Sequence, residues 1–169
     1  MTETRTINIA IVEDLREIRE GLARLINSTI GFCCTGVYAS MEDALEKIPH
    51  NLPDLVLSDI GLPGIDGISG IRILKERYPE LLIIMLTVYD DNERIFDALC
   101  AGASGYLLKK TPWEKLAEAL KEAVDGGSPM SPEVARRDQP LSRDQAAERS
   151  CLRSHAARGA SSTHARRRS

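Results

Sequence analysis

The feature of this sequence that most constrains its fold is an alternation, five times over, of short apolar runs with segments of helical periodicity between residues 7 and 127. The apolar runs are rich in β-branched residues and have the length of strands buried in a parallel sheet. Between them, apolar residues recur at intervals of three or four, which predicts amphipathic helices. The predicted strands cover residues 7–12, 32–38, 55–58, 81–87 and 105–108. The predicted helices cover approximately residues 18–29, 41–50, 67–78, 95–102 and 112–125.

Strands that alternate with helices predict a parallel sheet with helices on both faces, joined by right-handed crossovers. Residues 7–127 form a segment that is long enough to build one solid hydrophobic core. We therefore expect an α/β fold, a doubly wound (βα)5 domain. Its five-stranded parallel sheet is expected to have the flavodoxin-like order 2-1-3-4-5.

Local sequence signals mark the starts of three helices. Ser40 is expected to cap the second helix, because an acidic residue, Asp43, follows three positions later. Gly67 opens the third. The sequence Thr111-Pro112-Trp113-Glu114 has the form of a capping box with proline at the first helical position. We therefore expect the hydroxyl of Thr111 to cap the last helix.

The composition is that of a globular domain in water, with 43% hydrophobic and 28% charged residues and a net charge of −3. No apolar run approaches the roughly 20 residues that would span a bilayer, so no membrane association is expected. The first residues lack the basic-then-apolar layout of a secretory signal. The expected location is therefore the cytoplasm. The four cysteines form no CxxC pair and do not have the dense spacing of a disulfide scaffold.

Polar residues stand where four of the predicted strands end. Glu13 and Asp14 follow the first strand, Asp59 follows the third, Thr87 ends the fourth and Lys109 follows the fifth. All carboxyl ends of a parallel sheet lie at one edge, where open α/β folds bind their ligands. Three carboxylates brought together repel one another unless a cation neutralises them. A hard divalent ion such as Mg²⁺, which prefers oxygen ligands and accepts a phosphate, suits this set.

The same edge has the groups that phosphoryl transfer requires. Lys109 offers an ammonium for a phosphoryl oxygen and Thr87 a hydroxyl, while Asp59 can act as a carboxylate nucleophile. Each residue alone has an ordinary explanation: an acidic helix start, a polar strand end or a surface lysine. Their joint occurrence at one edge favours phosphoryl transfer. An aspartyl-phosphate phosphatase is not expected, because the second catalytic aspartate it needs is replaced by Gly61.

These residues resemble the receiver domain of bacterial two-component response regulators. The resemblance covers about residues 5–127 and depends on four stretches: IAIVEDLREIREGL, DLVLSDIGLPGIDGISGI, IIMLTVYDD and AGASGYLLKK. The second and fourth stretches look most like the NarL/FixJ-type subfamily. Its members usually have a LuxR-type helix-turn-helix after the receiver.

The resemblance implies that Asp59 is the phosphoacceptor and accepts its phosphoryl group from the phosphohistidine of a sensor histidine kinase. Glu13, Asp14 and Asp59 would hold Mg²⁺, together with the main-chain carbonyl of Gly61. Such a protein is a phosphoacceptor signalling protein of a phosphorelay and not an enzyme. It catalyses only its own phosphorylation and dephosphorylation.

The resemblance also implies a switch. Thr87 and Lys109 would contact the phosphate, and Thr87 and Tyr106 would shift inward to remodel the face of the fourth helix, fifth strand and fifth helix. From the residues alone, Tyr106 could equally be a half-exposed strand aromatic. A phosphorylation-dependent homodimer through that face is expected from the family. The expected output is transcription regulation; the alternative is a stand-alone receiver that acts by protein–protein contact without DNA binding.

The expected organisation is a receiver at residues 5–127, a linker at 128–137 and a basic tail at 138–169. The tail has seven arginines against three acidic residues and contains no Ile, Val or Phe. Such a segment is expected to be disordered and cannot form a helix-turn-helix core, so specific DNA binding is not expected. One explanation is a truncation or frameshift product. The other is a functional basic tail that binds nucleic acid through phosphates.

Overall fold

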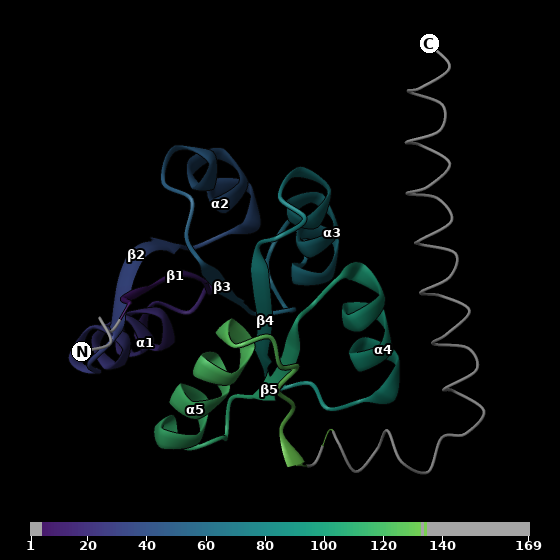
Figure 1. Cartoon of the computed structure of the whole chain (residues 1–169). Helices are drawn as coiled ribbons and strands as arrows, with labels where there is room; N and C mark the ends of the chain where they lie inside the picture. The colour runs from purple at the N-terminus through teal and green to yellow at the C-terminus, as the bar shows by residue number, and fades with distance from the viewer. Residues whose placement is uncertain (1–4, 133, 135–169) are drawn as a thin grey trace, which may run out of the picture.

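A computed structural model of the chain describes residues 5–132 and residue 134. Its centre is a single sheet in which every pair of neighbouring strands is parallel, in the order β2-β1-β3-β4-β5 (Figure 1). The predicted doubly wound fold and its strand order are therefore confirmed. The strands are β1 (Ile7–Val12), β2 (Phe32–Tyr38), β3 (Leu55–Ser58), β4 (Leu82–Thr87) and β5 (Gly105–Leu108).

Among the described residues, five α-helices connect and cover the strands. They are α1 (Arg16–Ser28), α2 (Met41–Lys47), α3 (Gly67–Arg77), α4 (Asn92–Ala101) and α5 (Trp113–Val124). A short 3₁₀ turn, Ile48–His50, continues α2. Apolar residues of α2, α3 and α4 pack on one face of the sheet, and those of α1 and α5 pack on the other. Both faces are thus covered, as right-handed crossovers between parallel strands require.

A hydrophobic core lies on each face of the sheet, and successive residues of each strand pack alternately into one core and the other. In β1, Ala10 and Val12 join the core under α2, α3 and α4, while Ile9 and Ile11 join the core under α1 and α5. This alternation follows from the period of two of an extended chain. Because both sets are apolar, the strand is recognisable in the sequence as a hydrophobic run, interrupted only at Asn8.

The helix starts agree with the sequence signals in two cases out of three. The hydroxyl of Ser40 accepts from the main-chain N–H of Asp43 at 3.1 Å, and α3 begins at Gly67 behind an Asp66 cap. The capping box at Thr111 is wrong. Helix α5 begins at Trp113 after Pro112 and has no side-chain cap, because the hydroxyl of Thr111 lies 3.1 Å from that of Ser131.

Residues that the sequence assigned to a linker lie beside β5. Met130 forms a parallel bridge with Tyr106, and Val134 is buried in the same core as Ile71 and Leu74. Their place along the edge of the sheet can be followed in Figure 1. The expectations for residues 138–169, and for most of 133–137, lie outside the described residues.

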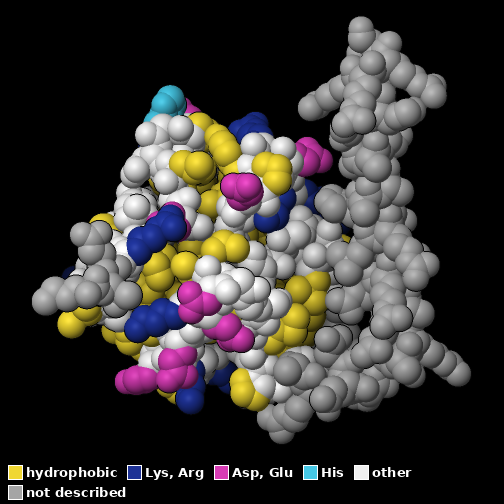
Figure 2. All heavy atoms as spheres, viewed as in Figure 1, with side chains coloured by type: hydrophobic (Ala, Val, Ile, Leu, Met, Phe, Trp, Pro, Cys, Tyr) yellow, Lys and Arg dark blue, Asp and Glu magenta, His cyan; other side chains and the backbone are white. Residues whose placement is uncertain are grey.

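Charged side chains of both signs are spread over the visible face in Figure 2, with apolar side chains between them. Within the described part of the chain, no helix is long and apolar enough to cross a membrane.

Candidate functional site

The carboxyl ends of the central strands bring the polar residues together. Val12 pairs with Ser58, so that Glu13 and Asp59 emerge side by side, and the N–H of Asp59 donates to the carbonyl of Val12 at 3.1 Å. On the other side of β3, the N–H of Lys109 donates to the carbonyl of Thr87 at 2.9 Å. The register of the sheet therefore fixes where each of these side chains begins.

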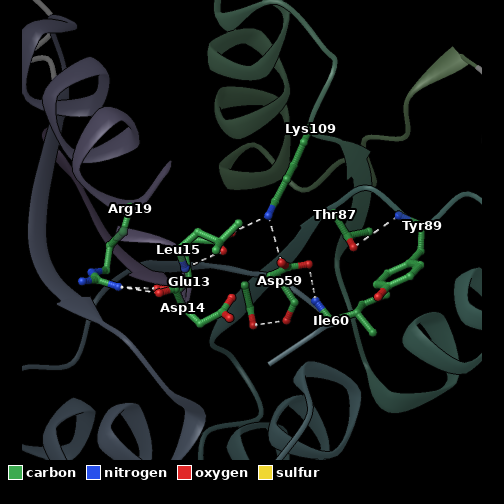
Figure 3. A network of polar contacts seen from close by, with 10 residues as sticks. Glu13, Asp14, Leu15, Arg19, Asp59, Ile60, Thr87, Tyr89 and Lys109 are labelled. Carbon is green, nitrogen blue, oxygen red and sulfur yellow. Dashed lines mark hydrogen bonds and ion pairs between the residues drawn. The ribbon is translucent and has the colours of Figure 1, made fainter. Parts of the chain in front are cut away.

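Three carboxylates meet at this edge (Figure 3). Oxygen atoms of Glu13, Asp14 and Asp59 all lie within 4.8 Å of one another. Glu13 and Asp59 are buried, with 2% and 7% of their surface exposed, and Asp14 is more open to solvent. Burial disfavours the charged form and raises the pKa of Glu13 above its ordinary value, although hydrogen bonds from Lys109 and Leu15 oppose that shift.

The ammonium of Lys109 lies between two of these carboxylates. Its Nζ is 2.6 Å from Oε2 of Glu13 and 2.9 Å from Oδ2 of Asp59. Burial lowers the pKa of Lys109, but the hydrogen bonds and charges of the two carboxylates outweigh burial, and the pKa is raised overall. Lys109 is therefore a cation at neutral pH, held against Asp59 by charge-assisted hydrogen bonds.

Main-chain groups orient the two buried carboxylates. Oδ1 of Asp59 accepts from the N–H of Ile60 at 2.7 Å, and Oε1 of Glu13 accepts from the N–H of Leu15 at 3.1 Å. From α1, the guanidinium of Arg19 donates to the carbonyls of Glu13 and Asp14 at 2.8 and 3.3 Å. Arg19 thus fixes the main chain of the acidic turn formed by Glu13 and Asp14. Nothing in the sequence around Arg19 predicts this role, since an arginine on a helix surface gives no local signal.

Thr87 and Tyr106 are joined through the main chain of Tyr89. The hydroxyl of Thr87 accepts from the N–H of Tyr89 at 3.4 Å, and the phenol of Tyr106 donates to the carbonyl of Tyr89 at 2.6 Å. Tyr106 is fully buried, so the alternative of a half-exposed aromatic is wrong. Burial raises the pKa of its phenol, which stays protonated at neutral pH and remains a donor. Tyr89 itself was not anticipated from the sequence.

The loop after Asp59 approaches the site closely. Gly61 lies against the ring of Tyr89, where an added Cβ would be 3.2 Å from the phenol oxygen. Arg94 stacks on the same ring, 4.3 Å from its centre. At the far end of the loop, a Cβ on Gly67 would lie 2.0 Å from the carbonyl oxygen of Asp59. The loop is therefore packed directly against the main chain of Asp59.

The donor set suits a hard divalent cation. Glu13, Asp14 and Asp59 all offer carboxylate oxygens, the ligands that Mg²⁺ prefers. These oxygens lie close enough together to share one ion. The part of Asp14 exposed to solvent leaves room for water ligands, which Mg²⁺ usually retains.

Comparisons with known proteins identify related sequences and structures. Residues 9–121 match the family model of the response regulator receiver domain. The chain is 34% identical over 128 residues to the transcriptional regulatory protein DegU of Brevibacillus brevis, an alignment that covers 76% of this chain and 54% of the relative. It is also 34% identical over 122 residues to the DNA-binding transcriptional activator DevR/DosR of Mycobacterium tuberculosis, with coverage of 72% and 56%. The chain thus spans about half the length of these curated relatives.

Solved structures show the same fold. A two-component response regulator of the LuxR family from Aurantimonas sp. SI85-9A1 superposes with a TM-score of 0.75 at 30% identity, covering 78% of this chain and 94% of that one. The isolated REC domain of RcsB from Salmonella enterica superposes with a TM-score of 0.73 at 22% identity. The family model matches about two thirds of the chain, and the solved structures share its fold. The chain therefore belongs to the response regulator receiver family, among relatives of the LuxR/NarL type.

Proposed function

We propose that the protein is a phosphorylation-controlled signalling module in which Asp59 accepts a phosphoryl group from the phosphohistidine of a sensor histidine kinase. The observation that supports this most directly is the position of Lys109. Its ammonium is within 2.9 Å of the Asp59 carboxylate and so stands where the charge of an incoming phosphoryl group would arrive. The family membership of the chain supports the same reaction class.

In the proposed reaction, a carboxylate oxygen of Asp59 forms a bond to phosphorus as the bond between phosphorus and the imidazole nitrogen of the donor breaks. The electron pair of the broken bond stays on the imidazole. Lys109 pairs with a phosphoryl oxygen, and the N–H of Ile60 holds the other carboxylate oxygen in place. In hydrolysis, a water oxygen forms a bond to phosphorus while the bond between phosphorus and the Asp59 oxygen breaks. The electron pair of that bond stays on the Asp59 carboxylate, and the phosphoryl group leaves as inorganic phosphate with the protons of the water.

Glu13, Asp14 and Asp59 would hold Mg²⁺, with the main-chain carbonyl of Gly61 as a further ligand. When bound, the ion would neutralise the negative charge that the phosphoryl oxygens bring to three carboxylates. Arg19, through its two hydrogen bonds to the main chain, keeps the carboxylates of the acidic turn directed at this place.

Tyr89 supports a role for Thr87 and Tyr106 as the switch. Because its N–H bonds to Thr87 and its carbonyl to Tyr106, movement of the Thr87 hydroxyl toward a phosphoryl group would disturb both contacts. A phosphorylation-dependent change of the face formed by α4, β5 and α5 would follow, with homodimerisation as its readout. This module is proposed to derive from a transcriptional regulator, as its curated relatives are transcription regulators by name.

The test is phosphoryl incorporation from acetyl phosphate in the presence of Mg²⁺, measured by intact mass. The wild-type chain is expected to gain one phosphoryl group, and Asp59→Asn none. Asp66→Asn is the matched control, because Asp66 is in the same loop and asparagine can still cap α3. It should be labelled like the wild type. Incorporation into Asp59→Asn at the wild-type level would contradict the assignment of the phosphoacceptor.

A further inference from the structure

A serine from beyond α5 reaches the turn that bears Lys109. The N–H of Leu108, which precedes Lys109, donates to the hydroxyl of Ser131 at 2.9 Å. The hydroxyl of Thr111, two residues after Lys109, lies 3.1 Å from the same oxygen. One side chain therefore bonds to both flanks of the lysine, across 23 and 20 residues of sequence.

Ser131 is itself firmly placed. In the part of the chain that the structure describes, it is one of the few buried polar residues, with 1% of its surface exposed. Its N–H donates to the carbonyl of Tyr106 at 3.1 Å, and the N–H of Tyr106 donates to the carbonyl of Pro129 at 3.0 Å. On its other side, the carbonyl of Ser131 accepts from the N–H of Val134, which is buried in the core. The main chain around Ser131 thus continues the sheet at the edge of β5.

The turn that Ser131 contacts determines where the Lys109 side chain starts. It is closed by a hydrogen bond from the N–H of Thr111 to the carbonyl of Leu108, at 3.0 Å. On the side that faces β4, the main-chain N–H of Lys109 donates a hydrogen bond to the carbonyl of Thr87. Ser131 supplies the support on the remaining side. A flexible lysine side chain reaches two carboxylates at once only if its main chain is held in place.

We propose that Ser131 is a positioning residue for phosphoryl transfer: by bonding to Leu108 and Thr111 it holds the turn that directs Lys109 at Asp59. The proposal rests on the proposed function of Asp59. It also means that the chain leaving the receiver is joined, through one hydroxyl, to the lysine that would sense the phosphoryl group. Displacement of residues 128–134 would then change the reactivity of Asp59.

The test compares rates of phosphorylation by acetyl phosphate at saturating Mg²⁺ in the full chain. Ser131→Ala is expected to slow the reaction about tenfold, because raising the activation barrier by the free energy of one hydrogen bond lowers the rate by about that factor. Thr111→Val, which keeps the shape of the side chain, should slow it in the same direction, and Thr111→Ser should restore the wild-type rate. Ser128→Ala is the matched control, because the Ser128 hydroxyl bonds to the carbonyl of Ser104 and not to the Lys109 turn. It should react like the wild type.

A double-mutant cycle separates positioning from a merely structural role. If Ser131 acts through Lys109, Ser131→Ala has no further effect on the rate in a Lys109→Met background, and Ser131→Ala alone leaves the affinity for Mg²⁺ within about twofold of the wild type. Equal slowing in both backgrounds, or equal slowing by Ser128→Ala, would overturn the proposal. A wild-type rate in both Ser131→Ala and Thr111→Val would also overturn it. None of these results affects labelling of Asp59 itself, whose loss in Asp59→Asn tests the proposed function separately.

Discussion

The ammonium of Lys109 lies 2.9 Å from the carboxylate of Asp59, although 50 residues separate them in the chain. The two residues meet because β3 and β5 flank β4 in a parallel sheet, so that both strands end at the same edge. The same ammonium is 2.6 Å from Glu13 at the end of β1. A single cation therefore ties together the ends of three strands that are not consecutive in the sequence.

Replacing Lys109 by methionine tests this cation directly. The variant keeps most of the length of the side chain but removes the group that offsets the charges of Glu13 and Asp59. We expect phosphorylation by acetyl phosphate to slow by on the order of 10²-fold, as when one preorganised electrostatic contact is removed from a reaction centre. The pKa of Glu13 should rise further, since the hydrogen bond from Lys109 now lowers it. Rates are measured by intact mass, and the pKa by carboxyl NMR.

Lys115→Met is the control for Lys109→Met. Lys115 lies in the first turn of α5 and forms an exposed ion pair with Glu118 at 3.7 Å. Exposed pairs of this kind contribute little, so the variant should be phosphorylated at the wild-type rate. Similar slowing in both variants would mean that net charge, and not the position of Lys109, governs the reaction.

Much of the fold could be predicted from the sequence because β1, β3, β4 and β5 are buried and largely apolar on both faces. The run from Ile7 to Val12 is recognisable without any knowledge of its neighbours, and the alternation with helices then determines a parallel sheet. Once the sheet is parallel, its carboxyl ends share an edge. The meeting of Glu13, Asp59 and Lys109 follows from topology, with no need for side-chain detail.

The contacts that support the site could not be predicted in this way. Ser131 and Arg19 act through single polar groups on partners distant in the chain, and neither leaves a periodic pattern. The capping box at Thr111 failed for a related reason. The hydroxyl of Thr111 could cap α5 or contact Ser131, and local sequence does not reveal a partner 20 residues away. Tyr89 contributes only main-chain groups to Thr87 and Tyr106, and these are the same in every residue type except proline.

Acidity should weaken metal binding at this edge. Burial raises the pKa of Glu13 above its ordinary value of 4.5, so the folded protein binds this proton more tightly than the unfolded chain does. The stabilising effect of that proton is complete below 4.5 and is lost as the pH rises through the raised pKa. A cation must displace the proton, and the dissociation constant of Mg²⁺ should therefore increase as the pH falls toward 4.5.

Titration calorimetry with Mg²⁺ at a series of pH values measures this effect. In Glu13→Gln, binding should be weaker at neutral pH, and its pH dependence should begin at a lower pH than in the wild type. The same onset in both proteins would show that another carboxylate is responsible.

The phenol of Tyr106 should contribute measurably to stability through Tyr89. Tyr106→Phe keeps the ring but removes the donor of the 2.6 Å hydrogen bond, leaving the carbonyl of Tyr89 without it. We expect the free energy of unfolding in urea to fall by about 1 kcal/mol. Tyr38→Phe removes a phenol on β2, at the opposite edge of the sheet, and is the control. A larger loss in Tyr38→Phe than in Tyr106→Phe would argue against a special role for the contact with Tyr89.

Gly67 is expected to be indispensable because the start of α3 touches the main chain of Asp59. A Cβ at this position would lie 2.0 Å from the carbonyl oxygen of Asp59 and 2.9 Å from Cα of Ile60, and neither main-chain atom can move without displacing the phosphoacceptor. Gly67→Ala should therefore lower the free energy of unfolding by roughly 3 kcal/mol, the upper range for overpacking a well-packed interior.

The same substitution elsewhere in the chain provides the comparison for Gly67. Gly21 lies within α1, where an added Cβ would meet nothing within 4 Å. Gly21→Ala should raise the free energy of unfolding by about 0.5–1 kcal/mol, because alanine loses less backbone entropy in a helix. Both variants are measured by urea denaturation, and phosphorylation by acetyl phosphate should slow only in Gly67→Ala. If Gly67→Ala were as stable and as reactive as Gly21→Ala, the close approach of α3 to Asp59 could not be a determinant of the site.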